Sequence, residues 1–565
     1  MLLRLCGLSL LLAAPLVFAP SASGQQADTT QLPEIAPREI EIRGERQIAL
    51  PSLERQPLSG FTSPPALPTV PTDHRPYKGS YTPSIDGIPD QLPVPEAVSA
   101  SMRPTAEPQQ GYLEGGSGRY FSRFFEGRLG VPLSPQDRLS VHGAYTGTEA
   151  DPNDDVATAR VRLAHTADPV RIDGSLHGAV QRYALYGAAP TSPFTSQTPD
   201  REGSTAGGAV QVRHTSPRAP ARLAVQYDNT QYTSNLSANT DEFVFSQQQL
   251  ALEGAATLPL PYRPRLTADY RRSWLGGDPQ DETAYDLAAE GTVSFSPIET
   301  VSIRGGAAVL AFATPAQPIQ STAQSVDQLR VGPVVDAEWR VADGTRLYLR
   351  NQPRLGETSL ERLYETNPYA QHAPSLRPTL EPIRAEAGLT HTRGRVRLIV
   401  AGGYRYAPTY RYFSLDQQAN VQGIYRVGYD AARIFQGRSE IALQGVDGIQ
   451  ASLGLSVRDG SLPDRDQPIP NFAPVTANAQ VAVSFADGNG FVQAHGEFQS
   501  PRDADLTQTV RVDSYFTMDL EGSYALGSDV DVVARVDHLS FEDPIQWANY
   551  PRPVAELSLG LRLRW

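Results

Sequence analysis

The sequence predicts an all-β protein: a transmembrane antiparallel β-barrel of about 22 strands, with any number from about 16 to 22 fitting the pattern, after a proline-rich irregular N-terminal segment. Three observations predict it. The last strand alternates apolar and polar residues, the same alternation recurs along residues 110–565, and the mean hydropathy is below zero. Barrel strands present only every second residue to lipid, so their average composition resembles that of a soluble protein.

The last eleven residues carry the clearest alternation. Successive side chains of a strand point to opposite faces, which puts Arg562 and Arg564 on one face and the apolar residues on the other. In a soluble β-sandwich, two arginines on the inner face would need partners in a dry core, whereas a water-filled lumen removes that cost. The closing aromatic residue is typical of bacterial outer-membrane barrels. We expect the barrel-assembly machinery to recognise an assembly signal made of Leu559, Leu561, Leu563 and Trp565.

The N-terminus has the layout of a secretory signal peptide. Arg4 precedes an apolar run from Leu8 to Phe18, and small residues follow up to Gly24. The run is too short to span a bilayer as a helix. Cys6 is the only cysteine and lies in the segment to be removed, so we expect no disulfide in the mature chain. We therefore assign residues 1–24 to a signal peptide and expect localisation in the outer membrane after cleavage.

Residues 25–109 form a proline-rich segment without a sustained period of 2 or 3.6. Proline removes backbone donors and fixes φ, so we expect an extended segment that lies in the periplasm or enters the lumen. One short stretch of this segment alternates apolar and charged residues: Ile40, Glu41 and Ile42 are a candidate docking strand that could add to the edge of a partner's sheet. The alternative is a solvated stretch that alternates by chance.

From residue 110 to the C-terminus, alternating segments are separated by connections of two kinds. Short turns such as Ser296-Pro297-Ile298 and Ala342-Asp343-Gly344 alternate with longer loops such as Gln352 to Thr379. That asymmetry is typical of periplasmic turns and external loops. The length allows about 21 residues for each strand and its connection, enough for the roughly 9–11 residues that span a bilayer.

This arrangement resembles the barrel of TonB-dependent outer-membrane receptors. The features that resemble it are the rhythm of short turns and long loops, Gly428-Tyr429-Asp430 ahead of a strand, the ending Leu559 to Trp565, and Glu39 to Gly44, which is similar to the family's N-terminal docking stretch. The resemblance implies passage or capture of a solute across the outer membrane. It also implies that a periplasmic energy-coupling or accessory protein binds near Ile40.

The sequence departs from this family ahead of the barrel. The family carries a globular plug there, and Gln25 to Gln109 is too short and too rich in proline to form one. Without a plug, a barrel of about 22 strands leaves a wide pore. The proline-rich segment, inward-folded loops or a partner would then have to fill it. A non-transporting scaffold that presents its loops or N-terminal segment to a protein partner is the alternative function.

Charged residues recur on the expected inner face of the strands. Clustered arginines would favour anionic solutes, whereas a lattice of salt bridges would only stiffen a wide lumen. The candidates carry charges of both signs, which favours the lattice of salt bridges. The lumen-facing candidates are Arg160, Arg162, Arg304, Arg346, Arg395, Arg397, Arg458, Glu290, Glu386 and Glu521.

Other chemistry finds little support in the sequence. The histidines are scattered without metal-ligand spacing, and no Ser/His/Asp set can be inferred, so we expect no enzyme, no cofactor and no metal site. The formal charge of −13 argues against nucleic acid as a partner, because neutralising phosphates requires a basic surface. The expected surroundings of the barrel are outer-membrane lipid.

Overall fold

The computed structural model describes residues 111–565 apart from 149–153, 191–198, 236–242, 277–281, 316–325, 373, 418–420, 447, 541–543 and 553. The expected signal peptide, the proline-rich segment and the candidate docking strand at Ile40, Glu41 and Ile42 lie outside the described residues.

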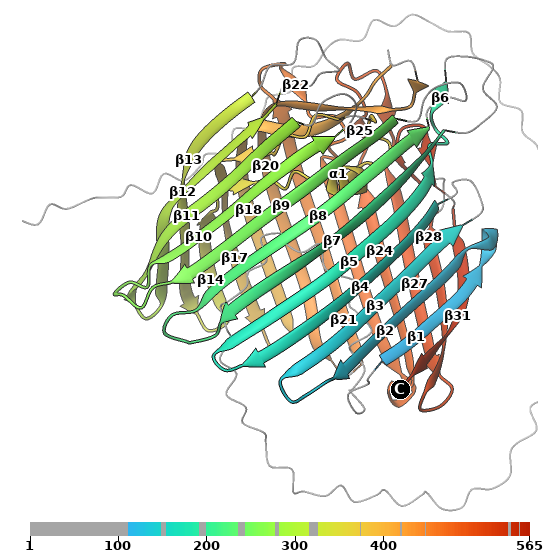
Figure 1. Ribbon diagram of the computed structural model, residues 1–565, viewed down its shortest axis with the longest axis horizontal. Coiled ribbons are helices and arrows are strands. Elements are labelled where there is room, and N and C mark those ends of the chain that lie inside the picture. The colour runs from blue at the N-terminus through green and yellow to red at the C-terminus, as the bar shows by residue number, and fades with distance from the viewer. Residues whose placement is uncertain are drawn as a thin grey trace, which may run out of the picture. The chain divides into compact units, whose positions relative to one another are not determined.

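Twenty-two strands form one closed antiparallel barrel, which confirms the predicted fold (Figure 1). Each strand pairs with the next one in the list below, and the last pairs with the first. In order they are β1 (Gly111–Gly118), β2 (Arg123–Pro132), β3 (Asp137–Thr148), β4 (Asp154–Ala167), β5 (Val170–Ala184), β7 (Asp200–His214), β8 (Ala221–Asn235), β9 (Phe243–Thr257), β10 (Arg265–Gly276), β11 (Glu282–Ile298), β12 (Val301–Thr314), β13 (Val326–Ala342), β14 (Thr345–Asn351), β17 (Ile383–Arg393), β18 (Val396–Leu415), β20 (Tyr425–Val446), β21 (Ile449–Leu462), β23 (Val475–Phe485), β24 (Gly490–Gln499), β27 (Tyr515–Ala525), β28 (Val530–Leu539) and β31 (Glu556–Arg564).

The terminal strand closes the ring. In the register of β31 with β1, Leu563 lies opposite Leu113, and beyond the ladder the backbone N–H groups of Gly111 and Trp565 donate to each other's carbonyls at 3.1 and 3.2 Å. Leu559 and Leu561 are 56% and 53% exposed, as expected of side chains that face lipid. The last strand thus pairs with the strand that starts at Gly111, while the assembly signal stays a prediction.

Connections at one end of the barrel are short, and we call this the turn end. It holds the turns Asp168-Pro169 and Asp343-Gly344, the 3₁₀ turn η3 (Ala486–Gly488) and Trp565. The turn expected at Ser296-Pro297-Ile298 was placed slightly too early, because β11 runs to Ile298. The pairing register shifts between Phe295 and Ile298, so the ladder passes over Pro297, which has no N–H to donate.

Connections at the other end, the loop end, are longer and carry structure of their own. Figure 1 shows α1, β6, β22 and β25 gathered there, away from the C-terminus. These pieces are η2 (Arg119–Phe121), β6 (Ala189–Pro190), β15 (Arg354–Leu355), α1 (Leu360–Thr366), β16 (Leu380–Glu381), β19 (Val421–Gln422), β22 (Gln467–Pro468), β25 (Arg502–Asp503), β26 (Arg511–Val512), β29 (Ile545–Trp547) and β30 (Tyr550–Pro551). None of the helices in the described part of the chain is long and apolar enough to cross a membrane.

Candidate ligand-binding site at the loop end

The connection between β14 and β17, residues 352–382, folds against the inner wall of the barrel, and we call it the inner loop. It contains α1, whose first turn is capped by Ser359: the Ser359 hydroxyl accepts from the N–H of Arg362 at 3.1 Å. Leu360, Leu363 and Tyr364 on this helix are at most 1% exposed. A seven-residue helix is marginal alone, so burial of this apolar face is what holds it.

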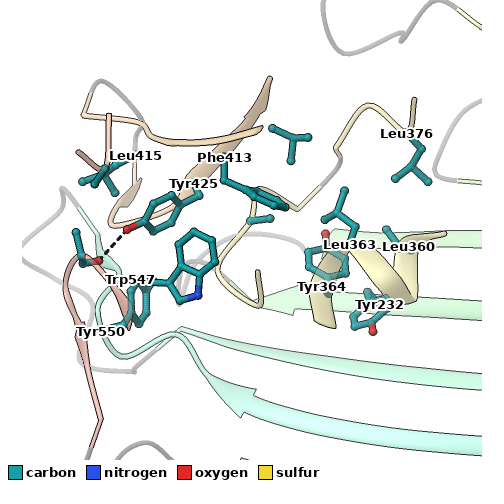
Figure 2. Close-up of a cluster of buried hydrophobic side chains, with 14 of the residues drawn as sticks. Tyr232, Leu360, Leu363, Tyr364, Leu376, Phe413, Leu415, Tyr425, Trp547 and Tyr550 are labelled. Carbon is teal, nitrogen blue, oxygen red and sulfur yellow. Dashed lines mark hydrogen bonds between the residues drawn. The ribbon is translucent and has the colours of Figure 1, made fainter. Parts of the chain in front are cut away.

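Buried side chains join the inner loop to distant strands. Figure 2 shows α1 next to Tyr232 of β8 on one side, with Phe413 of β18, Tyr425 of β20 and Trp547 of β29 continuing the cluster. The Trp547 ring meets the Tyr425 and Phe413 rings edge-on, with centroids 5.0 and 5.8 Å apart. The Tyr425 hydroxyl donates to the Ala548 carbonyl at 3.3 Å. One apolar core therefore ties together loops that are far apart in sequence.

Glutamine side chains of β9 hold the start of α1. The amide nitrogens of Gln247 and Gln249 both donate to the Thr358 carbonyl, at 3.0 and 3.1 Å, and the Leu360 N–H donates to the Gln247 side-chain oxygen at 2.6 Å. The two glutamines are 2% and 6% exposed. Buried polar groups need such partners, so these bonds fix where the inner loop leaves the wall.

Arg201 of β7 holds the other end of α1. Its guanidinium is fully buried and donates to the carbonyls of Pro368 and Ala370 at 2.5 and 2.7 Å and to the Ser234 hydroxyl at 2.8 Å. It also lies 4.2 Å from the centroid of the Tyr364 ring. Arginine suits this place because its planar group offers several donors in fixed directions. Farther along the loop, the ring of His372 lies 4.3 Å from that of Phe243.

A cavity of about 440 Å³ opens beside this core. Its walls come from β18, β21, the end of β24, the loops 463–474, 500–514 and 540–555, and the inner loop. Arg411, Arg458 and Arg502 line it together with Phe413 and Trp547. A concave site with apolar walls and a few charged groups is the usual form of a small-molecule site, so this is the candidate ligand-binding site.

Comparisons with known proteins agree on the architecture. No family model and no curated protein matches the sequence. Among solved structures, the FrpB iron transporter from Neisseria meningitidis is similar with a TM-score of 0.63 at 11% identity, over 82% of this chain and 83% of that one. The siderophore receptor PiuA from Acinetobacter baumannii gives 0.61 at 12%, over 81% and 82%. The ferric yersiniabactin uptake receptor FyuA from Yersinia pestis gives 0.59 at 14%, over 82% and 81%.

The chain has the fold of the TonB-dependent receptor barrel. At these identities the likeness shows the fold alone. It confirms the resemblance drawn from the rhythm of turns and loops and from the terminal strand.

Within this receptor fold, several of the predicted inner-face residues form ion pairs. Glu386 is within 3.0 Å of Arg438, and the pairs Arg162–Asp173, Arg304–Asp336, Arg346–Glu338 and Arg562–Glu521 span 2.8, 2.9, 3.1 and 3.7 Å. These pairs support a structural lattice, while a role in solute passage stays a prediction.

The other predicted residues do not gather in one place. Arg160, Glu290 and Arg397 belong to β4, β11 and β18, and Arg395 lies in the turn between β17 and β18. Arg458 is the one predicted residue that lines the cavity of the receptor-type barrel.

Sequence reasoning missed the most buried charges of the receptor-type barrel. Glu114 of β1 is 1% exposed and accepts from Arg535 and Arg562, each at 2.5 Å, across the seam that closes the ring. Asp531 is fully buried and accepts from Arg564 at 2.6 Å. Nothing in the local pattern marks Glu114, because its partners lie at the far end of the chain. Arg201, Arg411 and Arg502 were missed because the residues around them come from other segments of the chain. No group of three or more His, Cys, Asp or Glu in the described ranges could hold a metal ion.

Proposed function

We propose that the protein is an outer-membrane receptor that captures a solute at the loop end, facing the cell exterior, and passes it through the barrel. The observation that carries the proposal is the cavity, built by loops at one mouth of a barrel with the TonB-dependent receptor fold. Similar folds belong to proteins whose names describe iron transport and siderophore reception. The inner loop supports capture before passage, because a loop docked across the wall strands narrows the free path.

Energy coupling would come from the periplasm. We infer that Ile40, Glu41 and Ile42 add as an edge strand to a periplasmic coupling or accessory protein, after signal-peptide cleavage has released the mature N-terminus. A photo-cross-linking residue in place of Glu41 should give an adduct with a periplasmic protein in living cells. The same residue in place of Asp343, in a turn at the turn end, is the matched control. No adduct specific to Glu41 would remove the docking idea.

Planar-bilayer conductance tests the solute pathway. Three forms of the purified protein are needed: the mature chain, a form without residues 25–109, and a form that also replaces residues 357–377 of the inner loop with a short Gly-Ser linker. We expect the mature chain to be closed and the doubly altered form to conduct, because a barrel of about 22 strands encloses a wide lumen once nothing fills it. Heat-modifiable migration shows that each form is folded.

The alternative, a scaffold that only presents its loops to a protein partner, predicts a different result. All three folded forms would then stay silent. That outcome would contradict the solute pathway.

A further inference from the structure

The candidate site brings together three arginines from separate parts of the chain. Arg411 comes from β18, Arg458 from β21 and Arg502 from β25 in the loop 500–514. No aspartate or glutamate is among the residues that line the cavity. Elsewhere in the described barrel, many arginines lie within 4.0 Å of a carboxylate, as in the lattice of ion pairs. Among the described residues, the lining of the cavity therefore holds three positive charges and no carboxylate.

Two of these guanidinium groups have a buried N–H group without an acceptor among the described residues. Arg502 is 6% exposed; its Nη2 donates to the Gln546 carbonyl, but its Nη1 is buried without a hydrogen-bond partner among the described residues. Arg458 donates from Nη2 to the Ala473 carbonyl at 3.1 Å, while its Nε is buried and likewise unpartnered. Buried donors are nearly always satisfied, so these atoms indicate a missing acceptor.

The carboxylate whose charge acts on Arg502 does not supply that acceptor. Burial lowers the pKa of Arg502, and Glu497 acts against that shift through its charge. However, Glu497 does not line the cavity, and its carboxylate accepts from the Gln499 amide at 2.6 Å. Arginine stays protonated at any physiological pH, so Arg502 is a buried positive charge that a bound anion would stabilise.

We infer, building on the proposed function, that the captured solute carries two or more oxyanion groups, carboxylate or phosphate, on an apolar or aromatic body. Guanidinium groups bind both oxyanions through paired hydrogen bonds. Three cations from three directions match a multivalent anion better than a single charge. Phe413, Phe472 and Trp547 supply the apolar walls, and a cavity of about 440 Å³ suits a small organic molecule.

Tryptophan fluorescence of the purified full-length protein tests this inference, because Trp547 lies in the wall of the cavity. The probe is benzene-1,3,5-tricarboxylate, with benzene-1,3,5-triyl tris(phosphate) as the phosphate form and benzene-1,3,5-trimethanol as the neutral form. We expect saturable quenching by an anionic probe, none by the neutral one, and loss of the signal in Trp547→Phe. Tighter binding of one anion assigns the oxyanion.

Substitutions then locate the site. Arg502→Gln and, separately, Arg458→Gln should weaken binding of the anionic probe about tenfold or more, since each removes charged hydrogen bonds. Arg182→Gln is the matched control: this arginine forms ion pairs with Asp200 and Glu202 away from the cavity and should leave binding unchanged. Calorimetric titration of the unaltered protein gives an affinity that does not depend on the Trp547 signal.

Any of three results would overturn the inference: equal binding of the neutral probe, anion binding that survives both arginine substitutions in folded protein, or no binding of any anionic probe. The conductance test has a separate outcome. Anion binding without conductance would contradict passage through the barrel and keep the site, whereas conductance without anion binding would overturn only the inference.

Discussion

Arg201 is the place where a single substitution should release the inner loop without unfolding the barrel. Arg201→Met keeps an apolar chain of similar length but removes the donors that serve the carbonyls of Pro368 and Ala370. The Ala370 carbonyl then stays unsatisfied as long as the loop is docked, and the Pro368 carbonyl keeps only its bond from the Tyr183 hydroxyl at 3.1 Å. Undocking hydrates them, so the loop should open more often.

The magnitude follows from the contacts. The Ala370 carbonyl, left without a donor, costs about 1–3 kcal/mol, the bond lost at Pro368 costs about 1.5–3 kcal/mol, and the lost contact with the Tyr364 ring adds about 0.5–2 kcal/mol. In the native protein, the stabilisation from these contacts of Arg201 is offset by the cost of dehydrating its guanidinium group, several kcal/mol. We therefore expect docking to weaken by about 2–4 kcal/mol, which is roughly a 30- to 1,000-fold rise in the open fraction.

Hydrogen exchange measures this directly. The backbone N–H groups of Asn367 and Ala370 bond to carbonyls within the inner loop, and their exchange should accelerate by that factor. Amides in β4 and β5 should keep their rates. Arg182→Met, which removes a 57%-exposed arginine side chain one strand away, is the control and should change nothing in the loop. Exchange of residues 363–371 within twofold of the native rate, in a folded Arg201→Met barrel, would refute the anchoring role.

Three further predictions concern closure, assembly and pH. Glu114→Gln should lower the free energy of unfolding by about 3–5 kcal/mol, because it removes the buried carboxylate that two partly buried arginines share. Glu202→Gln at an exposed pair should cost under about 1 kcal/mol, and urea unfolding distinguishes the two variants. Deleting Trp565 should impair insertion into the outer membrane, and heat-modifiable, membrane-inserted protein without it would show that the terminal signal was misread. Burial, reinforced by the charge of Arg201, lowers the pKa of His372 below its usual 6.5. Protonation of His372 therefore favours the undocked loop. Docking is fully stable above about pH 6.5 and weakens as the pH falls toward the lower folded-state pKa. Hydrogen exchange of the loop, corrected for intrinsic rates, should rise between pH 7 and 5, and His372→Gln should remove that dependence.

The ion-pair lattice shows how far sequence patterns reach. Alternation identified Arg162 and Glu386 as inner-face candidates, because facing is a local property of a strand. Their partners, Asp173 and Arg438, depend on which strands are neighbours and in which register. Local sequence cannot predict the pairing of Glu114 with Arg562, since closure of the ring brings the two ends of the barrel sequence together.

The sequence by itself determined the barrel. A period of two over many segments, short turns against long loops, and an aromatic terminal strand are all local signals. Together they predicted an antiparallel barrel of about 22 strands, with 16 to 22 fitting the pattern, and the structure has 22. Only the tertiary structure decided what lies at its mouth. The inner loop docks through Arg201 of β7 and two glutamines of β9, and Arg411, Arg458 and Arg502 meet in one cavity. Such convergence depends on how long loops fold back over a closed ring, and no spacing along the chain encodes it.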